Sequence, residues 1–524
     1  MNKYDAIISA IALILLMSCD ISAQELQISG KIIEIAGIDN QTMNHLDVLT
    51  NRIGGRPIGS DAYHNATCWA ASLFEKWGME VEIQEAGELP VGFNRGAWFG
   101  KMLDDDGMTL HFATPSYTSG TKGVQRGHVV AEPKTRSQFE RMKGKLKGAW
   151  VLISGTSDGS AIDFSTRADE RRKAIIERND TISRYNDSIT QINRTNPTQT
   201  PIPLKELEDV PALFYKEMIE AGILGTIQSS PVPIRVLSAR NNVREMNFYT
   251  NLPTCPDIKL DENQYRIIAQ KVKERRYFQL EFDIRNYFKP GPVKYHNVIG
   301  IIRGSEFPDE YVMTGGHLDS YDVASGAVDC GTGVAPNLEA ARLIMAAGGK
   351  PRRTILFCLW AGEEFGLLGS KYWVEHNQDK WSKISNYFNR DGGPTVANSL
   401  TVPPAMYDDF KKATEQLNDI NPEFPFTLTQ RNNNPPQRPA SGNAGSSDHA
   451  WFAVNGIPVI SFGTGDPKGY DFNYGEIWHT ERDTYNMSIP EYMEHTSIVT
   501  AIVVYNLAMQ DKLLSREGLY RDEK

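Results

Sequence analysis

The side chains of this chain that are best suited to chemistry are those that bind metal ions or carry protons. They lie in the stretches GGHLDSYDVASGAVDCGTG, LWAGEEFGLLGS, NRDGG and IWHTERDTYN. The candidates within these stretches are His317, Asp329, Glu363, Glu364, Asp391 and His479. Zinc binds imidazole nitrogen and carboxylate oxygen, and a zinc site with an open position activates water. These residue types therefore predict metal-assisted hydrolysis.

The candidates divide naturally between two zinc ions, which would lie about 3.5–4 Å apart and share one ligand. Asp329 is the expected bridge. The two expected ligand sets, each completed by Asp329, are His317 with Asp391 and Glu364 with His479. Glu363 is left without a metal, so we expect it to act as the general base that moves a proton from the attacking water to the leaving amine. Asp319 is expected to accept the second N–H of the His317 ring and fix its tautomer.

Short apolar strands must position these residues. The expected strands are Asn297–Ile302, Tyr311–Thr314, Thr354–Trp360, Asn386–Asn389 and Ile457–Phe462, and the expected helices are Gly333–Ala347, Phe365–His376, Tyr407–Leu417 and Pro490–Met509. This alternation predicts an α/β fold with a mixed, mostly parallel sheet flanked by helices. His317, the Glu363–Glu364 pair and Asp391 each follow a strand. Because parallel strands end at one edge of a sheet, these residues should converge there.

The length of 524 residues suggests two or three domains. We expect a targeting segment at 1–23, the first part of the main domain at 24–118, an inserted module at 119–255 and the rest of the main domain at 256–524. Within the module, Arg167–Pro203 is rich in charged and amide residues and predicts a solvated helix followed by a linker.

The N-terminus has the composition of an export signal. Ala6–Met17 is an apolar run that is too short to span a bilayer as a mature helix. Leu16–Cys19 resembles a lipoprotein box, which would make Cys19 the lipid-anchored first residue of the mature chain. Cleavage after Ala23 is the alternative. Both interpretations place the protein in the periplasm or at the cell surface, with membrane contact only through a lipid at Cys19.

The overall composition excludes other classes of partner. A net charge of −10, a pI near 5.6 and the lack of a basic stripe argue against nucleic acid. Beyond Cys19, the cysteines are scattered and form no CxxC pair, so no structural zinc-thiolate site is predicted.

At this point the sequence resembles a known family, the dizinc exopeptidases that include leucyl aminopeptidases, glutamate carboxypeptidase and carboxypeptidase Q. The resemblance is closest to carboxypeptidase Q-like members. It rests on residues 317–323 with Gly326-Ala327, residues 359–364, Ser447-Asp448-His449 with Phe452, residues 456–458, and His479 with Asp483-Thr484. It implies the same metal ligands and base, two zinc ions per chain, and a protease-associated-like, β-rich inserted module.

One position departs from the family pattern. Many relatives have a second acidic residue after the bridging aspartate, whereas this chain has Cys330. The thiol is either a metal ligand or a small buried apolar residue.

Three further residues have less certain roles. Ser447-Asp448-His449 is not a serine triad, because contiguous side chains diverge and a triad converges from separate segments. Asp448 and His449 are expected to shape the substrate pocket or to orient metal ligands. Tyr485 is expected either to donate a hydrogen bond to the tetrahedral intermediate or simply to pack.

The expected function is hydrolysis of terminal peptide bonds in peptides or dipeptides, with a zinc-bridging hydroxide as nucleophile. The sequence leaves open whether the amino or the carboxyl terminus is recognised, and it does not indicate an oligomeric state. Two alternatives are a non-catalytic, receptor-like binding protein of the same fold and a zinc-dependent glutaminyl cyclotransferase. Retention of all the candidate positions argues against both.

Overall fold

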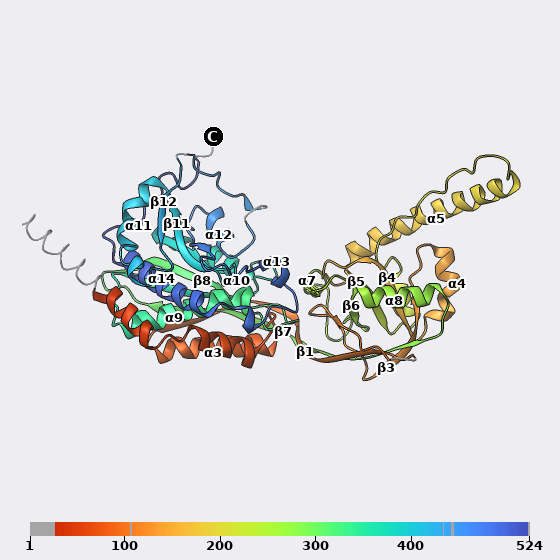
Figure 1. The fold of residues 1–524 in the computed structure, drawn as a ribbon, viewed down its shortest axis with the longest axis horizontal. Coiled ribbons are helices and arrows are strands. Elements are labelled where there is room, and N and C mark those ends of the chain that lie inside the picture. The colour runs from red at the N-terminus through yellow and green to blue at the C-terminus, as the bar shows by residue number, and fades with distance from the viewer. Residues whose placement is uncertain (1–26, 105–106, 433, 442–444, 522–524) are drawn as a thin grey trace, which may run out of the picture.

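The computed structural model describes residues 27–104, 107–432, 434–441 and 445–521. Two lobes lie side by side and are joined by two long antiparallel strands, β1 (Glu80–Met102) and β7 (Gln279–Ile302) (Figure 1). These strands pair from Glu80 with Ile301 to Met102 with Leu280. One ten-stranded sheet therefore runs through both lobes, in the order β10-β8-β9-β7-β3-β4-β5-β6-β2 with β1 on β7.

The remaining strands of this sheet are β2 (Phe112–Ala113), β3 (Gln125–Ala131), β4 (Ala149–Thr156), β5 (Gly225–Ser230), β6 (Asp257–Asp261), β8 (Phe307–His317), β9 (Arg353–Trp360) and β10 (Ile384–Asn389). A small separate sheet consists of β11 (Val396–Val402), β12 (Thr427–Gln430) and β13 (Gly463–Gly465).

The α-helices begin with residues 27–38 and continue with α2 (Thr42–Asp47), α3 (Asp61–Lys76), α4 (Arg136–Leu146), α5 (Thr166–Thr195), α6 (Tyr215–Glu220), α7 (Arg240–Val243), α8 (Glu262–Lys273), α9 (Thr332–Ala346), α10 (Leu368–His376), α11 (Tyr407–Ala413), α12 (His449–Val454), α13 (Tyr474–Ile477) and α14 (Pro490–Met509). The expected helices at α9, α10, α11 and α14 are confirmed, and the mixed, mostly parallel sheet is confirmed as well.

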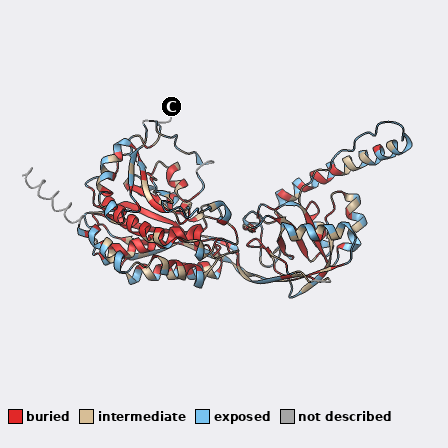
Figure 2. Ribbon diagram, viewed as in Figure 1, coloured by how far each residue is buried: buried red, intermediate tan, exposed pale blue. Residues whose placement is uncertain are grey.

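In the first lobe, β8, β9 and β10 are parallel and both faces of the sheet are covered. Every residue of β9 is buried (Figure 2). Alternate β9 side chains enter different cores, since Phe357 packs with α3, α9 and α14 whereas Cys358 packs with α10 and α12. A strand buried on both faces needs a continuous apolar run, which is the pattern in the sequence.

The second lobe carries parallel strands β3 to β6 with helices α4 and α8, and α5 projects away from it (Figure 1). The predicted surface excursion therefore contains a helix. The expected borders of the inserted module, 119–255, remain a proposal. In this lobe β2, which precedes residue 119, pairs with β6, which follows residue 255.

Two expected strands differ from the structure. β7 extends far beyond the predicted Asn297–Ile302, because its pairing with β1 carries it into the second lobe. Ile457–Phe462 was wrongly predicted as a strand. This segment lies beside β10 but forms no ladder with it. The Asn386 side chain instead donates a hydrogen bond to the C=O of Ile460 and accepts one from its N–H, both at 2.8 Å. Pro458 has no N–H to donate to a ladder.

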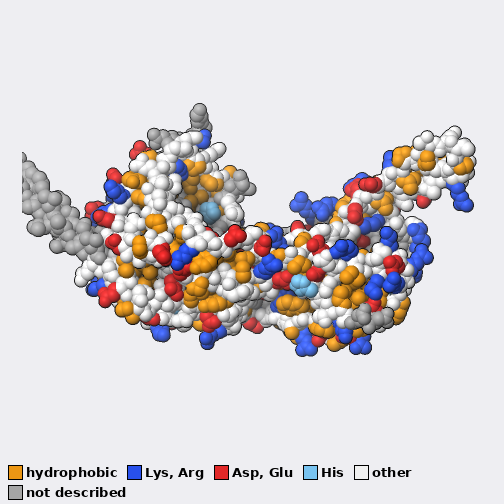
Figure 3. All heavy atoms as spheres, viewed as in Figure 1, with side chains coloured by type: hydrophobic (Ala, Val, Ile, Leu, Met, Phe, Trp, Pro, Cys, Tyr) orange, Lys and Arg blue, Asp and Glu red, His pale blue; other side chains and the backbone are white. Residues whose placement is uncertain are grey.

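The export signal and Cys19 lie outside the described residues. Within the described ranges, no helix is both long and apolar enough to cross a membrane. Lys/Arg and Asp/Glu side chains are interspersed over the face shown in Figure 3.

Candidate active site

Three parallel strands bring the predicted ligands to one edge of the sheet. His317 ends β8, Glu363 and Glu364 follow β9, and Asp391 follows β10. His317 is in register with Trp360, the last residue of β9. Asp329 lies in the turn before α9, and His479 follows the short helix α13. Segments remote in sequence therefore meet at the carboxyl ends of the strands, as expected for an open parallel sheet.

Asp329 lies between the two histidines. Its Oδ1 is 3.1 Å from His317 Nε2, and its Oδ2 is 3.1 Å from His479 Nε2. One buried carboxylate therefore directs each of its oxygens at a different imidazole, which is the arrangement that a bridging ligand requires.

Each histidine has one further carboxylate partner. His317 Nε2 is 3.6 Å from Asp391 Oδ1, and His479 Nε2 is 3.2 Å from Glu364 Oε2. The structure thus brings together the two sets predicted from the sequence. Their donor atoms are nitrogen and carboxylate oxygen, which suits zinc.

Burial and charge show that a cation fits here. Glu364 Oε1 and His479 Nδ1 are buried and have no hydrogen-bond partner among the described residues. Burial and the Asp329 charge raise the pKa of Glu364 to about 7. Burial lowers the pKa of His479, but Glu364 and Asp329 outweigh it and raise that pKa to about 9. Several buried carboxylates in contact need a compensating positive charge, which metal ions would supply.

Glu363 lies at this site without belonging to either ligand set. It lines the cavity beside Glu364 and Asp391. Burial, opposed by His317 and reinforced by Glu364 and Asp391, raises the pKa of Glu363 well above its ordinary value. A carboxylate that binds a proton more readily than an exposed one is suited to accept and then deliver it.

The structure corrects the expected role of Asp319. The backbone carbonyl of Asp319, rather than its carboxylate, accepts from His317 Nδ1 at 2.9 Å, whereas the carboxylate Oδ1 is 3.7 Å away. The carboxylate instead accepts the backbone N–H groups of Glu363 at 3.1 Å and Glu364 at 3.3 Å. The tight turn after β8 places the carbonyl closest to the ring. Asp319 therefore orients the ring and the glutamate pair together.

Sequence reasoning gave no role to two residues that shape the site. The Asp483 carboxylate accepts the backbone N–H groups of Val328 at 2.6 Å and Asp329 at 3.3 Å. The buried Arg56 side chain donates to the carbonyl groups of Leu318, Ser325 and Gly326. Asp483 lies four residues after His479, so its closeness to a predicted ligand could have indicated a role at the site. No feature of the sequence around Arg56 indicated such a role.

The site opens into a cavity of ≈ 1150 Å³. Its lining includes Leu237 and Arg240, which lie between β5 and β6, together with Tyr321, Tyr474, Trp478 and His449. Arg240 Nη1 donates to the Glu364 carbonyl at 3.3 Å. Both lobes therefore contribute to the cavity, which the sequence pattern of α7 did not indicate.

The three less certain residues lie in different places. His449 lines the cavity, in agreement with a pocket role, whereas Asp448 is fully buried behind it. Burial raises the pKa of Asp448 to about 7. Tyr485 is not part of the cavity lining, and its charged neighbours are Asp47 and Glu494. The proposed hydrogen bond from Tyr485 to an intermediate is therefore wrong, because the chain turns away after Asp483. Tyr321 and Tyr474 line the cavity instead.

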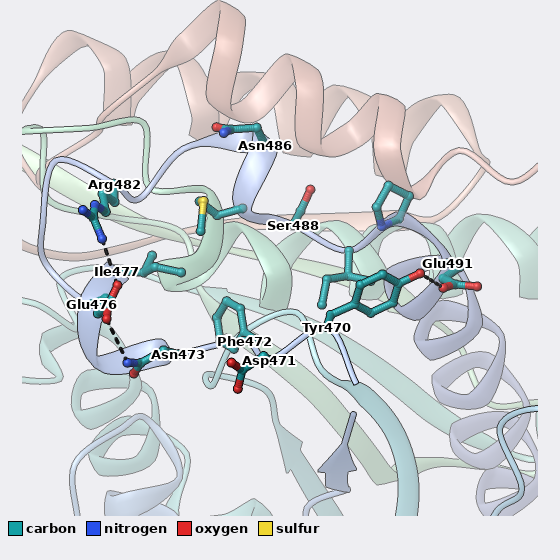
Figure 4. Close-up of a pocket in the computed structure, with 13 residues that line it drawn as sticks. Tyr470, Asp471, Phe472, Asn473, Glu476, Ile477, Arg482, Asn486, Ser488 and Glu491 are labelled. Atoms are coloured by element: carbon teal, nitrogen blue, oxygen red, sulfur yellow. Dashed lines mark hydrogen bonds and ion pairs between the residues drawn. The ribbon is translucent and has the colours of Figure 1, made fainter. Parts of the chain in front are cut away.

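A second pocket, of ≈ 570 Å³, is lined by residues within the segment 470–491 (Figure 4). Its lining includes Phe472 and Ile477, and the Arg482–Glu476 ion pair of 2.8 Å closes one end. The metal-capable groups found among the described residues both belong to the first cavity. We therefore assign the chemistry to that cavity.

Comparison with known proteins agrees with this geometry. Residues 297–503, which carry every predicted ligand and Glu363, match the model for peptidase family M28. The chain is a metallopeptidase, and the match to this family implies zinc.

Among relatives of this chain, carboxypeptidase Q of Mus musculus is 29% identical over 478 residues, which cover 91% of this chain and 87% of the relative. A probable glutamate carboxypeptidase, LAMP1 of Arabidopsis thaliana, is 33% identical over 237 residues, or 42% of this chain. That match covers 32% of the plant protein, about a third of its length.

Solved structures share the fold of this chain. A peptidase M28 precursor from Shewanella amazonensis has a TM-score of 0.56 at 18% identity, covering 94% of this chain and 99% of its own. BSAP, a zinc aminopeptidase from Bacillus subtilis, has a TM-score of 0.51 at 18% identity, and the match covers 92% of this chain and 98% of the BSAP chain. At this identity the likeness concerns the fold alone, and it extends over both lobes.

The contacts of Asp319 lead to a prediction about zinc binding and activity. Asp319→Ala should lower zinc affinity or activity about 10–100-fold, because both glutamate N–H groups lose their acceptor. Zinc affinity is measured by competition with a chromophoric chelator. Asp309→Ala, an exposed change before the β8 core, is the matched control. Unchanged zinc affinity and activity in Asp319→Ala would contradict the assignment.

Proposed function

We propose that this chain is an exported dizinc exopeptidase that hydrolyses the terminal bond of dipeptides or short peptides. The observation that carries the proposal is the placement of Asp329, with one carboxylate oxygen toward each of two histidines that have separate carboxylate partners. Export, and attachment through Cys19, belong to the same proposal and rest on the N-terminal sequence.

The residues of the site divide the chemistry between them. Asp329, with His317 and Asp391 on one side and with Glu364 and His479 on the other, would hold two zinc ions. Zinc bound there supplies Lewis acidity that polarises the scissile carbonyl and acidifies water. The Glu363 carboxylate accepts a proton from the attacking water and then donates it to the leaving amine. Asp319 holds the backbone of Glu363 so that this carboxylate faces the reacting atoms.

The charges of the cavity favour recognition of a free carboxyl terminus. Apart from the predicted ligands and Glu363, the described residues of the lining include no carboxylate that would bind a terminal amine. Two arginines are present. The Arg390 guanidinium donates to the carbonyl groups of Thr332, Gly393 and Thr395, whereas the Arg240 side chain is exposed at the cavity. We therefore propose the carboxypeptidase-like mode, with Arg240 binding the substrate carboxylate.

This mode predicts the effect of Arg240→Ala. KM for dipeptides with a free carboxyl terminus should rise about 5–10-fold with little change in kcat, because an exposed charged hydrogen bond is lost. Peptides amidated at that terminus should be unaffected. Arg244→Ala, at the exposed end of α7 and outside the lining, is the control. Equal KM changes for free and amidated peptides would rule out the carboxylate contact.

The function is tested by metal analysis together with a dipeptide panel. Two zinc ions per chain and hydrolysis of dipeptides blocked at the amino terminus support the proposal. Hydrolysis only of dipeptides with a free amino terminus would support the aminopeptidase mode instead. A native protein that binds no zinc would exclude a dizinc peptidase.

A further inference from the structure

Cys330 directly follows the bridging residue, and its thiol reaches the metal-capable set on the His317 side. Ligand atoms of His317, Cys330 and Asp391 all lie within 4.8 Å of one another. Asp329, Glu364 and His479 form the matching set on the other side. The two sets therefore differ in chemistry, since one of them offers sulfur.

The backbone around Cys330 fixes the position of the sulfur. A Cβ atom placed on Gly316 would lie 3.2 Å from the sulfur, and one placed on Gly333 would lie 2.4 Å from it. Glycine at Gly333 therefore leaves the space that the sulfur occupies, because any other residue there would overlap with it. The thiol donates to the Arg390 carbonyl at 3.2 Å. These contacts hold the sulfur at the edge of the sheet where the ligands gather.

The surroundings of Cys330 differ from those of the other buried cysteines. Cys255 and Cys358 each lie in an apolar core cluster. Cys330 is equally buried but belongs to none of the apolar clusters of the described residues, and its neighbours are an imidazole, a carboxylate and a carbonyl group. A small apolar residue would fill the space equally well. The polar surroundings, however, suit a donor atom more than a packing group.

We propose that Cys330 is a ligand of the metal ion that His317 and Asp391 hold. The inference rests on the dizinc function proposed above. On binding, the S–H bond breaks, the proton leaves to the solvent, and a sulfur–metal bond forms.

The ligand count then separates the two metal sites. With Asp329 shared, the Cys330 side has four protein donors, which is the closed arrangement typical of structural zinc. The Glu364 side has three, which leaves a position open to water or substrate. The open site also lies nearer the module, since Arg240 contacts the Glu364 carbonyl. We infer that, because the thiolate completes the site on the Cys330 side, the metal ion held by Glu364 and His479 is the one that faces the substrate.

X-ray absorption of the zinc-loaded full chain tests the inference directly. The expected result is a zinc–sulfur distance of about 2.3 Å that disappears in Cys330→Ser. Cys358→Ser, a buried cysteine in the apolar cluster of β9, should retain it. Cobalt-loaded protein should show a sulfur-to-metal charge-transfer band that is lost in the same variant only. These readouts do not depend on activity.

Cys330→Asp, which restores the acidic residue common among relatives, distinguishes a folding defect from loss of a ligand. This variant should bind two zinc ions without sulfur scattering. Two zinc ions and no zinc–sulfur distance in the unaltered protein would overturn the inference and leave the proposed function intact. No zinc in the unaltered protein would overturn the proposed function and the inference with it.

Discussion

Replacing Glu363 with glutamine should lower kcat about 10²–10⁴-fold, the range expected when a general base is lost. Zinc content and KM should stay close to those of the unaltered protein. The reason is geometric, because Glu363 lines the cavity but belongs to neither metal-capable set. Glutamine has the same shape and cannot accept the proton. Steady-state kinetics on a dipeptide, with metal analysis of the same sample, measures both quantities.

The neighbouring residue provides the contrast. Glu364→Gln should lower zinc content, because Glu364 Oε2 lies 3.2 Å from His479 Nε2 within the second ligand set. Glu375→Gln, an exposed change on α10, should affect neither activity nor zinc. If Glu363→Gln lost zinc while Glu364→Gln retained it, the roles of the two glutamates would have to be exchanged.

Replacing Asp329 with asparagine should abolish activity and reduce zinc binding at both sites. An uncharged amide has a single oxygen acceptor, whereas both carboxylate oxygens of Asp329 face histidines at 3.1 Å. Zinc per chain, measured after dialysis against a weak chelator, should fall toward zero, and peptidase activity should fall below detection.

Asp391→Asn is the matched variant for this test, because Asp391 belongs to the His317 set alone and not to the set of Glu364 and His479. It should lose one zinc ion and keep the other. The far-ultraviolet circular dichroism of both variants should match the unaltered protein, since the ligands lie at the sheet edge and the core strands are untouched. Retention of both zinc ions in Asp329→Asn would show that Asp329 does not bridge.

Much of the site was predictable because secondary structure alone placed it. Continuous apolar runs such as Thr354–Trp360 predict buried parallel strands, and parallel strands must end at one edge of the sheet. His317, Glu363 and Asp391 follow three such strands, so their convergence needed no tertiary information. The division of the candidates into two ligand sets followed from the need for one shared ligand.

Other features of the site depended on contacts between segments remote in sequence. The sequence showed Asp319 beside His317, but only the folded turn decided that its carbonyl contacts the ring while its carboxylate holds the glutamate pair. The sequence left two roles open for Tyr485, and only the folded chain shows that its side chain lies outside the cavity lining, which agrees with packing.

The sequence by itself predicted the chemistry that we propose for this protein: the expected ligands, the expected base and the strand ends that carry them. The tertiary structure decided what surrounds that chemistry. Long-range pairing of β1 with β7 joins the two lobes, and Arg240 enters the cavity from α7, a helix without any chemical pattern of its own. Gly316, remote from Cys330 in the sequence, lies against its thiol and leaves it room beside His317. Local periodicity specifies elements, whereas side-chain contacts across them depend on packing that no single stretch of sequence encodes.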